Sequence, residues 1–131
     1  MMGSLTSRDL LRLKGVHYDL VRVVRRASLT SPITFTVLEG LRTIERQKEL
    51  LKKGATTTLN SRHLTGHAVD IAPMIGTEIS WAWPLYYELA KVIKAAAKEE
   101  KVVIEWGGQW KFKDGPHWQL PWASYPCKSG V

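Results

Sequence analysis

The four histidines of this 131-residue chain fall into two groups by their sequence surroundings. His17 lies among apolar residues at helical spacing, which is typical of a packed or solvated side chain. The other three stand at expected junctions of loops and strands, where functional groups gather: His63, His67 and His117. Two neutral imidazoles and one carboxylate would hold a zinc ion and leave one position open for water. Such a site stays positive enough to lower the pKa of that water.

Strand periodicity indicates which histidine could share a metal ion with Asp70. Residues 67–72 alternate in polarity and predict a short strand. Because side chains alternate between the faces of a strand, Asp70 shares its face with two alanines that leave room for an ion. His67 falls on the opposite, more apolar face. The preceding loop leaves His63 free to turn toward Asp70, so His63 is the better candidate.

The last predicted strand, residues 117–120, repeats this reasoning. Trp118 would face the core, which leaves His117 and Gln119 on the open face. Asp114 precedes His117 by about one turn, where its carboxylate could reach a metal-bound water without contacting the ion. A metallopeptidase needs such a general base. The alternative is that these histidines and aspartates only cap helices or form hydrogen bonds within loops.

Two motifs carry a resemblance to a known superfamily. Ser61–Asp70 reads SRHLTGHAVD and resembles the Ser-x-His-x-x-Gly-x-Ala-x-Asp signature of zinc D-Ala-D-Ala peptidases, which are related in fold to hedgehog signalling domains. Asp114–His117, DGPH, resembles the second signature of that superfamily. The similarity extends from about residue 35 to residue 120. The ten-residue signature is highly specific, whereas DGPH by itself would be weak.

Within this superfamily, the chain most resembles phage endolysins that hydrolyse the L-alanyl-D-glutamate bond. The resemblance depends on the short chain, the run Glu39–Thr43 (EGLRT) and an aspartate at position 114. It implies Asp114 as catalytic base and three zinc ligands: His63, Asp70 and His117. It also suggests that Arg42 stabilises an oxyanion or anchors a substrate carboxylate. The alternative for Arg42 is a surface arginine near the start of a helix.

Three other functions stay open. A D-Ala-D-Ala dipeptidase or carboxypeptidase would use the same metal ligands on a different bond, but the short chain has little length for the loops of a closed dipeptide pocket. A catalytically silent, zinc-bearing binding module, like hedgehog, would keep the metal without turnover, although Asp114 argues against it. A basic nucleic-acid-binding protein would need a motif that the sequence lacks.

Composition places the chain among ordinary globular proteins. Its 131 residues suit a single domain, 1–131, with 44% hydrophobic and 24% charged residues. Cys127 is the single cysteine, so no internal disulfide can form. Nineteen basic residues against twelve acidic ones give a net charge of +7, which favours an anionic partner or merely serves solubility. The sequence has no nucleic-acid motif, and the resemblance implies peptidoglycan as that partner.

The N-terminal segment has no secretory signal, because charged residues interrupt any apolar run: Arg8, Asp9, Arg12 and Lys14. No stretch reaches the ~20 apolar residues of a membrane-spanning helix, so we expect no stable membrane insertion. The resemblance implies a phage enzyme that accumulates in the host cytoplasm and causes lysis once a membrane-permeabilising partner gives it access to the cell wall. We expect it to be a monomer.

The remaining pattern predicts an α+β fold, in which a small, largely antiparallel sheet packs with about three helices. The helices are predicted from residue 6 or 7 to 30, over 44–53, and from residue 80 or 83 to about 98. The strands are predicted over 33–38, 67–72, 102–106 and 117–120.

Other polar and aromatic residues have weaker support. Gln47, near Arg42, could be a surface residue of the second helix. Ser61 and Thr65 are candidates to orient ligands or substrate, with simple solvation as the alternative. Three tryptophans are candidates to line a wall-binding groove, although core packing is the better interpretation for most tryptophans: Trp106, Trp110 and Trp122.

Overall fold

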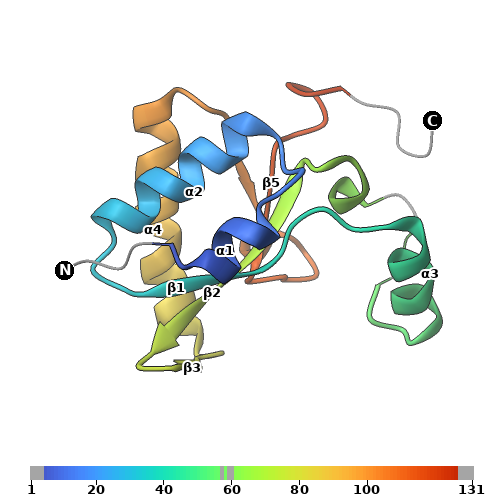
Figure 1. Ribbon diagram of the computed structural model, residues 1–131, viewed down its shortest axis with the longest axis horizontal. Coiled ribbons are helices and arrows are strands. Elements are labelled where there is room, and N and C mark those ends of the chain that lie inside the picture. Colours follow the sequence, from blue (N-terminus) through green and yellow to red (C-terminus); the bar gives the residue numbers. More distant parts are fainter. Residues whose placement is uncertain (1–4, 57, 59–60, 127–131) are drawn as a thin grey trace.

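The computed structural model describes residues 5–56, 58 and 61–126, so Cys127 lies outside the described residues. Within this part, the fold consists of four α-helices and a small five-stranded sheet, and α3 stands apart from the other helices (Figure 1). The helices are α1 (Ser7–Arg12), α2 (Tyr18–Thr30), α3 (Ile44–Lys52) and α4 (Trp83–Glu100). The strands are β1 (Phe35–Glu39), β2 (Ala68–Ile75), β3 (Glu78–Ile79), β4 (Glu105–Trp106) and β5 (His117–Gln119). Two short 3-10 helices, η1 (Arg62–Thr65) and η2 (Gly107–Gln109), complete the list.

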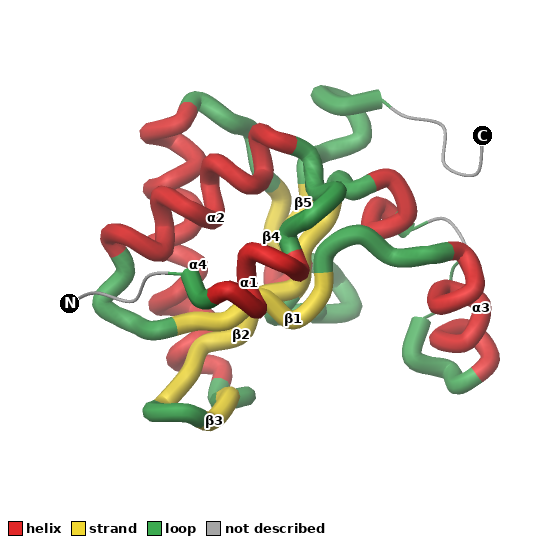
Figure 2. The backbone as a smooth tube through the Cα atoms, in the orientation of Figure 1, coloured by secondary structure: helices red, strands yellow, loops and turns green. Residues whose placement is uncertain are grey.

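The sheet is antiparallel at each described pairing, in the order β1-β2-β5-β4, with β3 added to the far end of β2 (Figure 2). Asp70 pairs with Glu39 of β1 on one side and with His117 of β5 on the other. This register brings three chemically active side chains into one row across the sheet. The predicted α+β class and antiparallel sheet are confirmed.

The hydrophobic core lies on one face of this sheet, against α2 and α4. Val69 and Ile71 of β2 are fully buried there, with Val37 of β1 and Trp118 of β5. The intervening Asp70 lies outside this cluster and keeps 20% of its side chain exposed. The alternation predicted for the strand therefore separates the packing residues from the polar row.

The first predicted helix is wrong in one respect, because the structure divides it into α1 and α2. Gly15 adopts φ +84° between them, a conformation that ends the first helix. The buried carboxylate of Asp9 accepts hydrogen bonds from the Val37 N–H and the Thr36 hydroxyl, which ties α1 to β1. His17 then starts α2, because its Nδ1 accepts a hydrogen bond from the Asp19 N–H.

Other predicted elements differ mainly at their ends. Thr43 caps α3, and Pro84 lies in the first turn of α4. The strand predicted to end at residue 72 continues to Ile75, and Pro73 pairs with Phe35 inside it. The loop before β2 contains η1, which the polar sequence did not predict. In the part of the chain that the structure describes, every helix is too short or too polar to span a bilayer.

Candidate metal centre

His63 is held in place by the local geometry of η1. The Ser61 hydroxyl caps this turn by accepting a hydrogen bond from the His63 N–H at 3.1 Å. Gly66 ends it with φ +77°, and a side chain there would overlap the Gly15 carbonyl oxygen. His63 Nδ1 lies 2.8 Å from the Gly40 carbonyl oxygen, which can only accept. His63 Nδ1 therefore carries a hydrogen, and in the neutral tautomer Nε2 has a lone pair for a metal ion.

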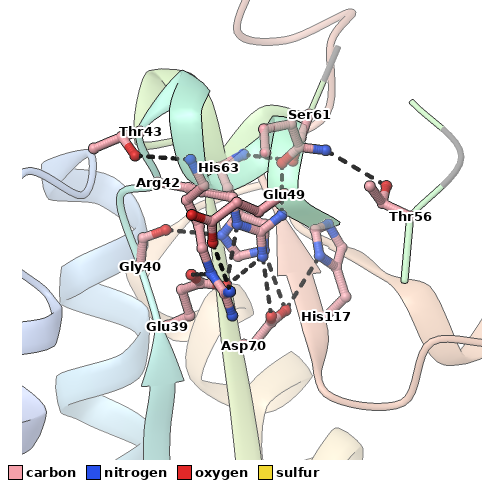
Figure 3. A network of polar contacts seen from close by, with 12 residues as sticks. Glu39, Gly40, Arg42, Thr43, Glu49, Thr56, Ser61, His63, Asp70 and His117 are labelled. Carbon is pink, nitrogen blue, oxygen red and sulfur yellow. Dashed lines mark hydrogen bonds and ion pairs between the residues drawn. The ribbon is translucent and has the colours of Figure 1, made fainter. Parts of the chain in front are cut away.

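Asp70 stands between two histidines, each of which turns one ring nitrogen toward it. His63 Nε2 lies 3.2 Å and His117 Nδ1 3.3 Å from the same oxygen, Asp70 Oδ1. One candidate ligand atom from each residue lies within 4.8 Å of the other two. Figure 3 shows the Asp70 carboxylate pointing toward both rings. The structure thus brings together the three predicted ligands, and this group could bind a metal ion.

The charges of this group fit a cation. Burial alone would raise the pKa of Asp70, but its contacts with His117 and His63 outweigh burial and hold the pKa far below its ordinary value. Burial opposes the charged form of His117, yet the contact with Asp70 raises the pKa of that imidazole. Two nitrogen lone pairs aimed at a carboxylate oxygen repel it unless a positive charge lies between them. The group therefore attracts either protons or a metal ion.

A chain of hydrogen bonds fixes the His117 ring from behind. His117 Nε2 donates to the Gln119 Oε1 at 2.7 Å, and Gln119 Nε2 donates to Glu105 Oε1 at 3.0 Å. The indole N–H of Trp110 donates to the other Glu105 oxygen at 3.4 Å, and its ring centroid lies 5.0 Å from that of His117. Because Nε2 donates in this chain, Nδ1 stays available as a ligand.

Arg42 belongs to this site and is not a surface residue. Its side chain is 9% exposed, and its guanidinium donates to Gln47 Oε1 at 2.8 Å and to the Glu39 carboxylate. One guanidinium nitrogen lies 3.8 Å from Asp70 Oδ2. The surface interpretation of Gln47 is wrong, because this side chain is fully buried and donates to the Thr58 carbonyl oxygen. Gln47 therefore fixes Arg42 from the side of α3.

Asp114 lies on the turn that leads into β5. Its N–H donates to the Gly107 carbonyl oxygen at 2.9 Å, and its own carbonyl accepts from the His117 N–H at 3.2 Å. A side chain at Gly107 would press against the Asp114 carbonyl oxygen at 2.5 Å, so this turn needs glycine. Loss of surrounding water raises the pKa of the Asp114 carboxyl, and the negative charge of Asp70 raises it further.

One cavity of about 640 Å³ joins these groups, which is a usual volume for a ligand site. All five predicted site residues line it: Arg42, His63, Asp70, Asp114 and His117. Trp110 and Trp122 also line it. Trp106 does not take this role, because it is 4% exposed and stacks on Trp118 in the core.

His67 lies away from the three ligand candidates, as strand parity predicts. Its Nδ1 is 2.7 Å from the Thr65 hydroxyl, and its ring packs near His17 and Tyr125. Thr65 therefore contacts His67, whereas Ser61 supports His63. Sequence reasoning did not single out Glu39 or Glu105 as site residues, although they line the cavity from β1 and β4. Glu39 stood only within the EGLRT run, and Glu105 only near the end of a predicted strand.

Comparison with known proteins decides the family. Residues 1–119 match the family described as phage L-alanyl-D-glutamate peptidase. The chain belongs to this family. Membership confirms the predicted resemblance and the peptidase class.

Individual relatives are named for the same peptidase activity as the family. The chain is 29% identical over 118 residues to the L-alanyl-D-glutamate peptidase of Escherichia phage T5, covering 87% of this chain and 86% of the relative. It is 34% identical over 99 residues to the L-alanyl-D-glutamate peptidase of Listeria phage A118, covering 75% of this chain but 34% of that longer protein. The crystal structure of Serratia marcescens L-Ala D-Glu endopeptidase ChiX is 47% identical, with a TM-score of 0.90 and 96% of each chain covered.

Proposed function

We propose that this chain is a zinc-dependent endopeptidase that hydrolyses the L-alanyl-D-glutamate bond of peptidoglycan stem peptides. The observation that carries the proposal is the convergence of His63 Nε2 and His117 Nδ1 on Asp70 within a cavity that Asp114 also lines. The family and its named relatives supply the substrate class. Zinc is the metal that best suits two imidazoles and one carboxylate with an open position.

In this proposal each side chain has one task. His63, Asp70 and His117 hold the ion, which when bound supplies a Lewis acid for the scissile carbonyl and for a water. Asp114 accepts a proton from the attacking water and returns it to the leaving nitrogen of D-glutamate. Its raised pKa suits a group that must both take and release a proton near neutrality.

Arg42 is proposed to bind the substrate rather than the ion. Its guanidinium is held by Glu39 and Gln47 and lies beside Asp70 at the cavity wall. A fixed guanidinium stabilises developing charge on the carbonyl oxygen or anchors a substrate carboxylate. Because its partners hold it before the substrate arrives, little ordering is needed at the moment of reaction.

We further propose that the enzyme acts as a monomer at the cell wall. A phage protein of this kind is made in the host cytoplasm and needs a membrane-permeabilising partner to reach peptidoglycan. The net charge of +7 supports binding to an anionic wall polymer. Sedimentation of the purified chain tests the monomer, and lysis that depends on co-expression of such a partner tests the route.

The decisive experiment digests purified peptidoglycan and identifies the products by mass spectrometry, with zinc measured in the same preparation. The expected products are peptides that begin with D-glutamate, while L-alanine stays on the muramic acid. Release of D-alanine or D-Ala-D-Ala with the L-alanyl bond intact would instead support a D,D-peptidase. A zinc-loaded protein that yields no product would support a silent binding module.

A further inference from the structure

The proposed bond lies very close to the glycan strand of its substrate. A single residue, L-alanine, separates the scissile bond from the lactyl group of N-acetylmuramic acid. An extended residue spans about 3.5 Å, so the sugar ring must lie within roughly 10 Å of the reacting carbon. An enzyme that cuts this bond in intact wall therefore has a sugar at the edge of its cavity, whether or not it contacts that sugar.

Trp122 stands at the edge of the cavity on a rigid support. The support is Arg62, which is 2% exposed and precedes the ligand candidate His63. Its guanidinium donates to the backbone carbonyls of Leu120 at 2.9 Å and of Tyr125 at 2.8 Å. The same guanidinium lies 4.2 Å from the Trp122 ring centroid. One buried side chain thus fixes both the segment that carries Trp122 and one face of its indole ring.

The other part of the indole ring remains available. Trp122 is 38% exposed and lines the same cavity as the metal group. A large apolar ring that is both held in place and open to solvent beside an active site gives a contact surface at little cost in side-chain entropy. Trp122 also lies beyond residue 119, where the match to the peptidase family ends.

The two cavity tryptophans contact different residues around the metal group. Trp110 packs on His117 and shares the turn after η2 with Asp114. Trp122 instead contacts Arg62 of η1, next to His63. In the proposed function Asp114 returns a proton to the D-glutamate nitrogen, and on that basis we assign the D-glutamate side of the substrate to the Trp110 turn. The L-alanine side is then assigned to η1 and Trp122.

We infer that Trp122 is a binding surface for the N-acetylmuramic acid ring on the L-alanine side of the scissile bond. The apolar C–H face of a pyranose ring packs on the exposed indole, while Arg62 holds the indole from behind. This inference rests on the proposed function and adds a sugar subsite to it. The enzyme then recognises wall peptide that is still attached to glycan in preference to free stem peptide.

The test compares two substrates that share the scissile bond. One is a disaccharide–tetrapeptide muropeptide, and the other is the same tetrapeptide without its sugars. The wild-type chain should show a lower KM for the muropeptide. Trp122→Ala should reduce kcat/KM for the muropeptide about tenfold, a usual scale for truncating an aromatic contact residue. The same variant should change kcat/KM for the free peptide by less than about twofold.

Control variants distinguish a loss of sugar recognition from a loss of folded structure. Trp122→Phe keeps an aromatic face and should recover most of the preference for the muropeptide. Trp81→Ala removes a 61% exposed tryptophan that does not line the cavity, and it should leave both substrates unaffected. Zinc content and thermal midpoint are measured for each variant, so that a loosened C-terminal segment is recognised.

The outcomes distinguish the inference from the proposed function. If the wild-type chain cleaves both substrates with equal KM, or if Trp122→Ala weakens both equally, the sugar subsite is wrong while the peptidase stands. If the wild-type chain cleaves neither substrate at the L-alanyl bond, the proposed function itself fails. A loss confined to the muropeptide, with zinc and stability unchanged, is the result that the inference requires.

Discussion

Two histidine pairs each include one residue at η1, because His63 lies within this turn and His67 follows it. Among the described residues, only the pair with His63 forms a candidate metal centre. The ring centroids of His63 and His117 are 5.0 Å apart, and those of His17 and His67 are 5.3 Å apart. In the first pair, Asp70 lies between the two free ring nitrogens. In the second pair the neighbouring group is the aromatic ring of Tyr125. Proximity of histidines is therefore not enough to make a metal site.

The hydrogen-bond partners of the ring nitrogens explain why only one histidine pair forms a candidate metal centre. In the site, the nitrogens that point away from Asp70 bond to Gly40 and Gln119, which leaves the inner nitrogens free. In the other pair, Nδ1 of His17 caps α2 and Nδ1 of His67 bonds to a threonine hydroxyl. The pKa directions agree, because the pKa of His117 is raised by its carboxylate partner whereas burial and a nearby arginine lower that of His67. The surroundings of His117 favour a positive charge on its ring, and those of His67 disfavour one.

The largest expected effect comes from breaking the first cluster. His117→Ala removes an imidazole from the group around Asp70, so we expect the folded variant to lose its zinc and its peptidase activity to fall to background. Elemental analysis per folded chain measures the metal, with circular dichroism to confirm folding. Full zinc occupancy in this variant would disprove the assignment of His117 as a ligand.

A second variant separates the base from the metal ligands. Asp114→Asn cannot accept a proton, so activity should fall by about 10²–10⁴-fold while zinc and fold are retained. Turnover of peptidoglycan fragments and zinc content are measured on the same sample. Near-normal turnover by the zinc-loaded variant would mean that another group acts as the base.

A third variant tests the support behind His117. Gln119→Leu keeps the approximate volume of the side chain but removes the acceptor for His117 Nε2. Zinc affinity, measured by competition with a chelator, should fall by about 10–100-fold. Gln109→Leu changes an exposed glutamine of η2 and serves as the matched control, with affinity unchanged. Equal zinc affinities for the wild type and both variants would show that the hydrogen-bond chain does not support His117 as a ligand.

The contrast between the clusters also explains what the sequence could predict. His63 and Asp70 share a ten-residue motif whose family resemblance implied both as ligands, and strand parity set His67 on the other face. Pairing of β2 with β5 then brings His117 beside Asp70. Parity predicted a shared polar face, but it contained no information about which strands would be neighbours.

Residues that depend on distant packing escaped prediction. Gln47 is buried because α3 and the following loop enclose it, and a single polar residue on an amphipathic helix carries no sign of this. The break between α1 and α2 at Gly15 depends on contacts with Leu41 and Gly66, which are far along the chain. Helical spacing on both sides of the break therefore predicted one continuous helix.

The smallest expected effect comes from the second cluster. His67→Asn should retain zinc and substantial activity, because His67 lies outside the cavity lining and bonds to Thr65. Burial lowers the pKa of His67 below its ordinary value, and positive Arg62 lowers it further, so the folded chain disfavours protonation of this ring. The unfolded chain takes up a proton on it near pH ~6.5, which costs the wild-type protein stability as the pH falls below that value. Asparagine does not titrate, so the free energy of unfolding of the variant, relative to wild type, should improve from about pH 8 to about pH 5. Chemical denaturation at both pH values with zinc content measured in parallel tests this, and either a constant difference or loss of metal would contradict the separation of the two clusters.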